Sequence, residues 1–325
     1  MLKKDIILTN RDIAALSTLD VFLPERIFDA HAHVFSSSHL PSTHRYGEEN
    51  VADLETYFLN MTPLLLNPRE LRVNLITYPD SSMADISSGN LDRADEFLIE
   101  QLNKSDSNVG EIMVVPGESV YDIEKRLSHP RIRGLKCYFN MSKRQEHGDE
   151  SPEEYLPESA WLVADKHRLA ITLHLGKERA LSAPENLSYI KCMAEKYRNA
   201  KLILAHSARA FSARTAIDSV ENLRKYENVW FDFSAICESP SIMKIIKTVG
   251  VGRCMWGSDY PTNTFLGKAI SYADKFAWLD GTVLDGAWNL GVENLMAMKE
   301  AADILELSRA DIEDIFYNNA VRLFN

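Results

Sequence analysis

The sequence predicts an α/β fold in which eight parallel strands, each followed by a helical segment, close into a (β/α)8 barrel. Short apolar, β-rich runs recur about every 32 residues, which is close to the length of one strand–helix–strand unit. Runs such as IMVV at 112–115 and LILA at 202–205 are continuously apolar, as parallel strands covered on both faces are. A doubly wound open sheet is the competing architecture, but no GxGxxG follows the first run.

The eight predicted strands are separated by longer, more polar segments of helical character. We expect these segments to form the outer layer of the barrel. In chain order the strand-like runs are IFDAHAHV at 27–34, LRVNLITY at 71–78, EIMVVPG at 111–117, IRGLKCYF at 132–139, LAITLHLG at 169–176, KLILAHSA at 201–208, NVWFDFSA at 228–235 and RCMWGSDY at 253–260.

Two connections, 35–68 after the first strand and 140–160 after the fourth, are longer than a barrel needs. Both follow the carboxyl end of a strand, so we expect them to overhang the mouth of the barrel as lid or specificity loops. Residues 1–26 form a lead-in and residues 296–325 form closing helices in this scheme. Because no linker or further repeat is visible, residues 1–325 are predicted to be one domain.

The charge of the chain narrows its expected partners. Lys and Arg number 36 and Asp and Glu number 47, which gives a formal net charge of −11 and a pI near 5.4. Such a charge repels phosphate backbones and anionic membranes, so we expect neither nucleic acid nor a membrane as partner. A small-molecule substrate is the expected ligand, and a homo-oligomer is compatible with the sequence.

The cysteines and the N-terminal segment indicate in which cellular compartment the protein is expected. The first residues lack the apolar core and small-residue cleavage site of a secretory signal, and no stretch approaches 18 consecutive apolar residues. No two cysteines form a CxxC pair, and three of them lie in apolar runs, so free thiols and a cytoplasmic location are expected. The four are Cys137, Cys192, Cys237 and Cys254.

Polar residues interrupt the apolar runs at or near their carboxyl ends. His31 and His33 lie in the first run, His174 in the fifth, His206 in the sixth and Asp259 in the eighth. Burying such a group without a partner costs a few kcal/mol, so each needs a reason. In a barrel the carboxyl ends of the strands surround one mouth, where residues far apart in sequence converge.

The spacing of His31 and His33 indicates a metal site. Residues at i and i+2 of a strand point to the same side, which places two imidazoles beside one ion. Together with His174 and Asp259 they would give three histidines and one carboxylate. This ligand set suits Zn²⁺ and, less selectively, Fe²⁺ or Mn²⁺.

Several segments resemble the amidohydrolase superfamily, specifically its amidohydrolase-related (amidohydrolase 2) branch. These are the DAHAHVF start, the strand-borne His174, LILAHSA, MWGSDYP and the closing stretch LSRADIEDIFYNNAVRLFN. The resemblance covers about residues 27–325 and implies a distorted (β/α)8 barrel that holds a divalent metal ion, most simply Zn²⁺.

The resemblance also implies a role for each polar residue at the mouth of the barrel. His31, His33, His174 and Asp259 would bind the metal, and His206 would act beside it as an acid, a base or an electrostatic group. Asp259 would share in proton transfer, as ligand carboxylates of this superfamily do. A metal lowers the pKa of bound water towards 7 and polarises a carbonyl oxygen, so metal-dependent hydrolysis of an amide, ester or lactone is the expected activity.

Three further residues are predicted to bind the substrate: Lys136, Arg209 and Tyr138. In some superfamily members a carboxylated lysine on the fourth strand bridges two metals, so Lys136 could instead make the site binuclear, or point to solvent. Arg209 follows His206 where many relatives carry glycines, and it could hold a substrate carboxylate or pair with an acid at a helix start. Tyr138, Trp256 and Tyr260 either form an aromatic wall or pack the fold.

Two other functions remain open at this point. The same branch contains non-oxidative decarboxylases of aromatic or unsaturated acids, which would use the same site. A non-catalytic barrel that only binds a ligand is the third reading, but every expected polar residue is retained.

Asp232 and Ser234, at the end of the seventh run, could support the metal ligands from outside.

Overall fold

Eight parallel strands form the centre of the computed structural model, which describes residues 6, 8–38, 40, 50–66, 69–273 and 275–325. The strands follow one another around the sheet in the order of the chain, and each lies within or overlaps a run predicted from the sequence. They are β1 Arg26–Ser36, β3 Glu70–Thr77, β4 Val109–Met113, β5 Ile132–Tyr138, β6 Ala170–His174, β7 Lys201–Leu204, β8 Val229–Asp232 and β9 Cys254–Met255.

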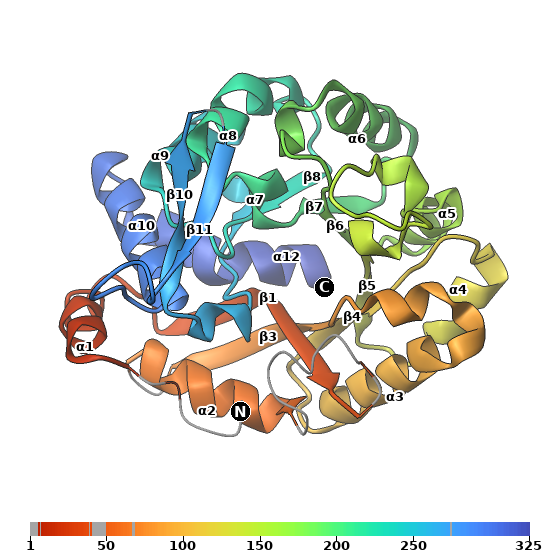
Figure 1. Ribbon diagram of the computed structural model, residues 1–325, viewed down its shortest axis with the longest axis horizontal. Helices are drawn as coiled ribbons and strands as arrows, with labels where there is room; N and C mark the ends of the chain where they lie inside the picture. Colours follow the sequence, from red (N-terminus) through yellow and green to blue (C-terminus); the bar gives the residue numbers. More distant parts are fainter. Residues whose placement is uncertain (1–5, 7, 39, 41–49, 67–68, 274) are drawn as a thin grey trace.

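The sheet closes on itself between its first and last strands. Ala30 N donates to Trp256 O at 3.0 Å, and His33 N donates to Tyr260 O at 2.7 Å. A parallel bridge also pairs Ala32 with Tyr260. The predicted (β/α)8 barrel is therefore confirmed, with helices around the strands (Figure 1).

The helices cover the barrel with amphipathic faces. In α9 (Ser239–Val249), for example, Ile242, Ile245 and Ile246 are buried at the i, i+3, i+4 spacing of one helix face. The other long helices are α1 Asn10–Ser17, α2 Leu54–Leu64, α3 Asn90–Asn103, α4 Val120–Arg126, α5 Glu158–His167, α6 Pro184–Lys196, α8 Ala213–Ser219 and α10 Leu290–Ile304.

The C-terminal segment fills the amino-terminal end of the barrel. It consists of α11 (Arg309–Glu313), a π-helical turn (Asp314–Asn318) and α12 (Asn319–Phe324), and α12 lies across the centre of the view in Figure 1. Phe324 packs on Phe28, with 5.7 Å between ring centroids, in a buried cluster that joins residues of several strands to Ala320 and Leu323 of α12. Because this end is apolar and filled, polar chemistry is restricted to the carboxyl end.

Both long connections carry secondary structure of their own. The first contains β2 (Val51–Ala52), which pairs antiparallel with β1, followed by α2. Residues 39, 41–49 and 67–68 of that connection lie outside the described part of the chain. The second connection contains the short 3-10 turn Pro152–Glu154.

The structure also contains an element that the sequence did not predict. After Asp259 the chain forms an antiparallel hairpin of β10 (Gly267–Tyr272) and β11 (Lys275–Asp280). The run FAWL at 276–279 within β11 was a strand-like signal that the sequence analysis did not use.

All four cysteines are free, and Cys137, Cys237 and Cys254 are buried, as predicted. Within the described ranges, no helix combines the length and apolarity needed to cross a bilayer.

The end of α5 generates a prediction about stability. Arg168 caps this helix in the left-handed conformation, with φ 57° and ψ 36°, and its side chain is exposed. A Cβ is unfavourable in that conformation, so Arg168→Gly should raise the free energy of unfolding by about 0.5–1 kcal/mol in urea denaturation. Arg168→Ala removes the same charge but keeps the Cβ, and an equal gain in that control would contradict the conformational explanation.

Candidate active site

The predicted site residues meet at the carboxyl end of the barrel, but His206, Arg209 and Asp259 lie beyond the strands. β7 ends at Leu204 and β9 at Met255, so His206 and Asp259 belong to the turns that follow. Both residues have left-handed φ angles, 50° and 57°. These turns direct both side chains into the buried cluster, a placement that strand periodicity alone does not predict.

Three side-chain atoms converge within this cluster. His31 Nε2 lies 3.3 Å from His33 Nε2, and Asp259 Oδ1 lies 3.7 Å from the first and 3.6 Å from the second. All three residues are buried. The convergence of His31 and His33 agrees with the same-side spacing read from the sequence, although a register shift interrupts β1 between Asp29 and Ala32.

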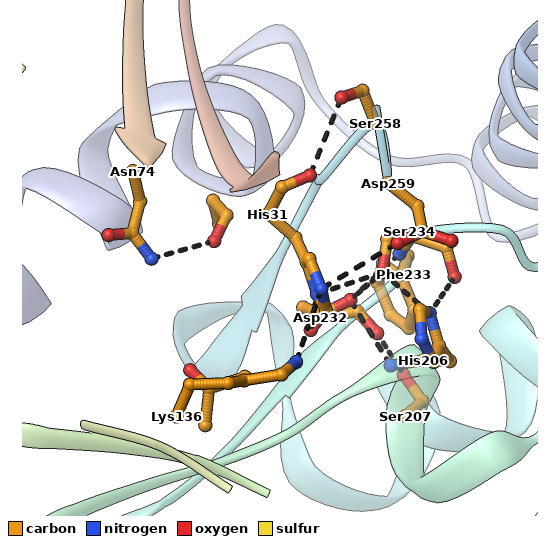
Figure 2. Close-up of polar contacts among 12 residues, drawn as sticks. His31, Asn74, Lys136, His206, Ser207, Asp232, Phe233, Ser234, Ser258 and Asp259 are labelled. Atoms are coloured by element: carbon orange, nitrogen blue, oxygen red, sulfur yellow. Dashed lines mark hydrogen bonds and ion pairs between the residues drawn. The ribbon is translucent and has the colours of Figure 1, made fainter. Parts of the chain in front are cut away.

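Asp232 fixes the orientation of the His31 ring. Its Oδ2 accepts from His31 Nδ1 at 3.0 Å, so Nδ1 carries the proton and the Nε2 lone pair faces His33 and Asp259. Figure 2 shows the His31 ring with Lys136 on one side and Asp232, Ser234 and His206 on the other. The carboxylate therefore sets the tautomer that a metal ligand requires.

The same carboxylate joins β1 to the two turns that follow β7 and β8. Its Oδ1 accepts from the backbone N–H groups of His206, at 3.2 Å, and Ser234, at 3.0 Å, and also from the Ser234 hydroxyl. The backbone oxygen of Asp232 accepts from Ser207 Oγ at 2.8 Å. The position of Asp232 and Ser234 behind the cluster agrees with the supporting role suggested by the sequence.

His174 and His206 lie beside the trio rather than within it. The ring of His206 is stacked on His31, with 5.1 Å between centroids, and the ring of His174 meets His206 edge-on at the same distance. His206 Nδ1 donates to the backbone oxygen of Ser234 at 3.1 Å, which leaves Nε2 as the acceptor. His174 Nδ1 donates to the backbone oxygen of Leu175 at 3.1 Å.

Lys136 is fully buried and points into the cluster, with Nζ 3.3 Å from His31 Nε2. Burial lowers its pKa, against the charges of Glu111, Asp232 and Asp259. Glu111, on the neighbouring strand, accepts from Asn74 Nδ2 at 2.8 Å and from Thr172 Oγ1 at 2.9 Å. Sequence reasoning did not single out Glu111, although a glutamate in the otherwise apolar run 111–117 was a signal of the same kind as the histidines.

The interior is electrostatically prepared for a cation. Burial lowers the pKa of the His31, His33 and His174 imidazoles well below the usual value, and it lowers that of His206 to about 3. Burial also raises the pKa of Asp259 above its usual range, although the nearby Lys136 opposes this. A divalent ion binds neutral imidazoles, and its charge stabilises a buried carboxylate in the ionised form that burial disfavours.

Arg209 and Tyr138 stand at the edge of this cluster. The Tyr138 ring lies 4.1 Å from the His174 ring between centroids. Arg209 Nη1 donates to the backbone oxygen of Lys177 at 2.9 Å, and its charge contributes to the lowered pKa of His174. Arg209 closes a left-handed turn in which all four residues from His206 onwards have positive φ.

Two aromatic residues from the sequence analysis pack the fold. Trp256 is stacked on Phe316, and its Nε1 donates to Asn294 Oδ1 at 2.9 Å. Tyr260 is fully buried against Tyr57. The sequence analysis missed two aromatic residues that lie closer to the site. The ring of Phe211 lies beside that of His206, and the ring of Phe276 lies beside that of Phe211.

Comparison with known proteins adds two findings about this chain. The model of the amidohydrolase family matches residues 28–325. No curated protein matches significantly.

Solved structures of similar architecture cover nearly the whole chain. A 5-carboxyvanillate decarboxylase from Sphingomonas paucimobilis is 13% identical, with a TM-score of 0.57 over 93% of this chain and 99% of that chain. A putative 2-pyrone-4,6-dicarboxylic acid hydrolase from Pseudomonas putida is 16% identical, with a TM-score of 0.59 over 93% and 98%. A Burkholderia multivorans amidohydrolase with bound zinc is 11% identical, with a TM-score of 0.59 over 92% and 99%. At these identities the likeness shows a shared fold.

The bonds to Asp232 predict a large effect of Asp232→Asn. Both carboxylate oxygens accept hydrogen bonds, so in either orientation an amide would turn its NH₂ group towards a donor. We expect a loss of about 3 kcal/mol in the free energy of unfolding, measured by urea denaturation. Ser234→Ala removes only one donor to this carboxylate and should cost clearly less; equal losses would contradict the central role of Asp232.

Proposed function

This chain belongs to the amidohydrolase family of enzymes, and we propose that it is a metal-dependent hydrolase acting on the carbonyl group of a small, carboxylated amide, ester or lactone. The proposal rests first on the buried trio of His31, His33 and Asp259. Family membership supports the class of enzyme, and the geometry of the site supports the reaction.

The separations within the trio fit a metal centre. In a tetrahedral zinc site with bonds of about 2.0–2.1 Å, the ligand atoms stand about 3.3–3.4 Å apart. The three separations here are 3.3, 3.6 and 3.7 Å. Two imidazole nitrogens and a carboxylate oxygen at such distances are placed as ligands of one ion, which is the observation that carries the proposal.

His31, His33 and Asp259 would hold the ion, with His174 as the fourth ligand. The two-histidine core suits Zn²⁺ best, and Mn²⁺ or Fe²⁺ less selectively. When bound, the ion supplies a Lewis acid that polarises a carbonyl oxygen and makes water more acidic.

His206 is the proposed acid and base. Its Nδ1–H is held by the backbone oxygen of Ser234, so Nε2 is the ring nitrogen that carries the lone pair. Nε2 can therefore accept a proton from water as that water adds to the substrate carbonyl, and return it to the leaving group. Asp259 shares this transfer through its carboxylate.

Lys136, Arg209 and Tyr138 are proposed to bind the substrate. Arg209 and Lys136 offer positive charge at the edge and the base of the cluster, which suits a substrate that carries a carboxylate. Because Lys136 Nζ already lies 3.3 Å from a proposed metal ligand, a carboxylated Lys136 that bridges a second ion is the alternative to be tested.

Non-oxidative decarboxylation of a small aromatic or unsaturated acid is the second candidate. The observation that favours it is the pair of cationic side chains beside the cluster, together with the likeness in fold to a 5-carboxyvanillate decarboxylase. In that reaction His206 or Asp259 would deliver the proton that replaces CO₂ on carbon.

Metal content tests the proposed centre. Elemental mass spectrometry of protein purified without chelators should find about one transition metal ion per chain, and His33→Ala should reduce this severalfold. His167→Ala alters a partly exposed histidine that is bonded to Glu124 and should leave the content unchanged. About two ions per chain would instead support a bridging Lys136, and no metal after supplementation with zinc or manganese would contradict the proposal.

The role of Asp259 can be measured by turnover. Asp259→Asn removes a ligand and a proton-transfer group, so activity should fall by about a thousandfold or more while the circular dichroism spectrum is retained. The matched control is Asp303→Asn on the surface of α10, where the carboxylate pairs only with Lys299 among the described residues. Full activity of Asp259→Asn would refute the mechanism, and CO₂ release without hydrolysis would assign the lyase reaction.

A further inference from the structure

The β10–β11 hairpin lies over the active-site mouth. Polar contacts anchor it at two places to the segments around that mouth. Ser271, on β10, donates from its backbone N–H and its hydroxyl to Glu238 at 2.7 and 2.6 Å, just before α9. Lys275, on β11, forms an ion pair with Glu178 at 2.6 Å, in the loop that follows β6. In Figure 1 the hairpin crosses the face of the barrel beside α7 (His206–Arg209) and α8.

One face of the hairpin carries two aromatic rings that pack against Phe211. The register pairs Ser271 with Phe276 and Ala269 with Trp278, so these four side chains share a face, whereas Tyr272 and Lys275 share the other. Phe211 lies 5.0 Å from Phe276 and 5.1 Å from Trp278 between ring centroids.

Phe211 in turn lies against the active site. Its ring is 5.3 Å from that of His206 between centroids. A single layer of aromatic side chains therefore separates the hairpin from the histidine cluster.

Arg209 is held between this hairpin and the barrel. Its Cζ lies 5.5 Å from the centroid of the Phe276 ring, at a distance typical of a cation–π contact, and its Nη1 donates to the backbone oxygen of Lys177. Within the described part of the chain Arg209 forms no ion pair with a carboxylate. Glu178, which acts electrostatically on Arg209, is already paired with Lys275 of the hairpin.

A largely buried guanidinium that lacks an acidic partner, beside the proposed reaction centre, is suited to bind an anion. Carboxylates accept two parallel hydrogen bonds from a guanidinium, and stacking on an aromatic ring fixes the plane in which those bonds are offered. Lys177 O occupies one of the five N–H donors and thereby orients the remaining ones.

We propose that the β10–β11 hairpin is the specificity element of this enzyme, and that Phe276 is a positioning residue that holds Arg209 in place to bind the carboxylate of the substrate. This inference rests on the proposed function for the location of the substrate, but it does not depend on a metal. Glu178 and Glu238 anchor the hairpin to the segments after β6 and β8, and the anchored hairpin places Phe276 against Arg209.

Benzoate and benzamide test the proposal, because they share a ring and differ in charge. Isothermal titration of the full-length protein should give a dissociation constant about tenfold or more lower for benzoate than for benzamide. The ratio should fall below about threefold in Arg209→Met and in Phe276→Leu, and Phe276→Trp should preserve it. A loss of ring packing alone would weaken both probes together and leave the ratio unchanged.

Two controls make the outcome decisive. Tyr272→Leu removes a ring from the opposite face of the same hairpin, where the side chain is 51% exposed, and should keep the ratio. Titration after treatment with EDTA should also keep it, because Arg209 rather than an ion reads the charge. Thermal melting of each variant verifies that it is folded.

Three results would overturn the proposal: no preference for benzoate in the wild type, an unchanged ratio in Arg209→Met or Phe276→Leu, or a ratio that disappears with EDTA. The last would assign charge selection to the metal and leave the proposed hydrolase intact. Conversely, a protein that binds no metal even after supplementation with zinc or manganese, but keeps the benzoate preference, would refute the metal-dependent reaction and leave this inference intact.

Discussion

The contact between His31 Nδ1 and the buried carboxylate of Asp232 is the constraint on which the site depends. Because the carboxylate can only accept, it holds the proton on Nδ1 and turns Nε2 towards His33 and Asp259. The other oxygen accepts from the backbone N–H groups of His206 and Ser234, so one side chain joins the middle of β1 to the turns after β7 and β8. Such a group is both a structural tie and a determinant of ligand chemistry.

The barrel separates stability from chemistry along its axis. The amino-terminal end is filled by Phe28, Phe324 and their neighbours, where apolar burial stabilises the fold without polar groups. The carboxyl end tolerates what such a core excludes: neutral imidazoles, a buried lysine and a turn of left-handed residues from His206 to Arg209. The favourable burial at one end offsets the desolvation and strain at the other.

Loops rather than strands decide how the site meets a substrate. Arg209 is bonded to the loop after β6, and it contacts Phe276 of a hairpin that follows β9. The same hairpin is anchored to the loops after β6 and β8. A common scaffold can therefore change its substrate by changing these connections while the residues proposed to bind the metal stay in place.

The sequence by itself determined the fold class, the eight strands and the residues that gather at one mouth, because apolar runs at a fixed period and polar residues at their ends are local patterns. It also indicated that His31 and His33 face the same side, since strand geometry has a period of two. Only the tertiary structure decided that His174 lies beside the trio, that Lys136 is buried against His31 and that Phe276 contacts Arg209. These contacts join residues far apart in the chain, through turn angles and ring orientations that no local pattern encodes.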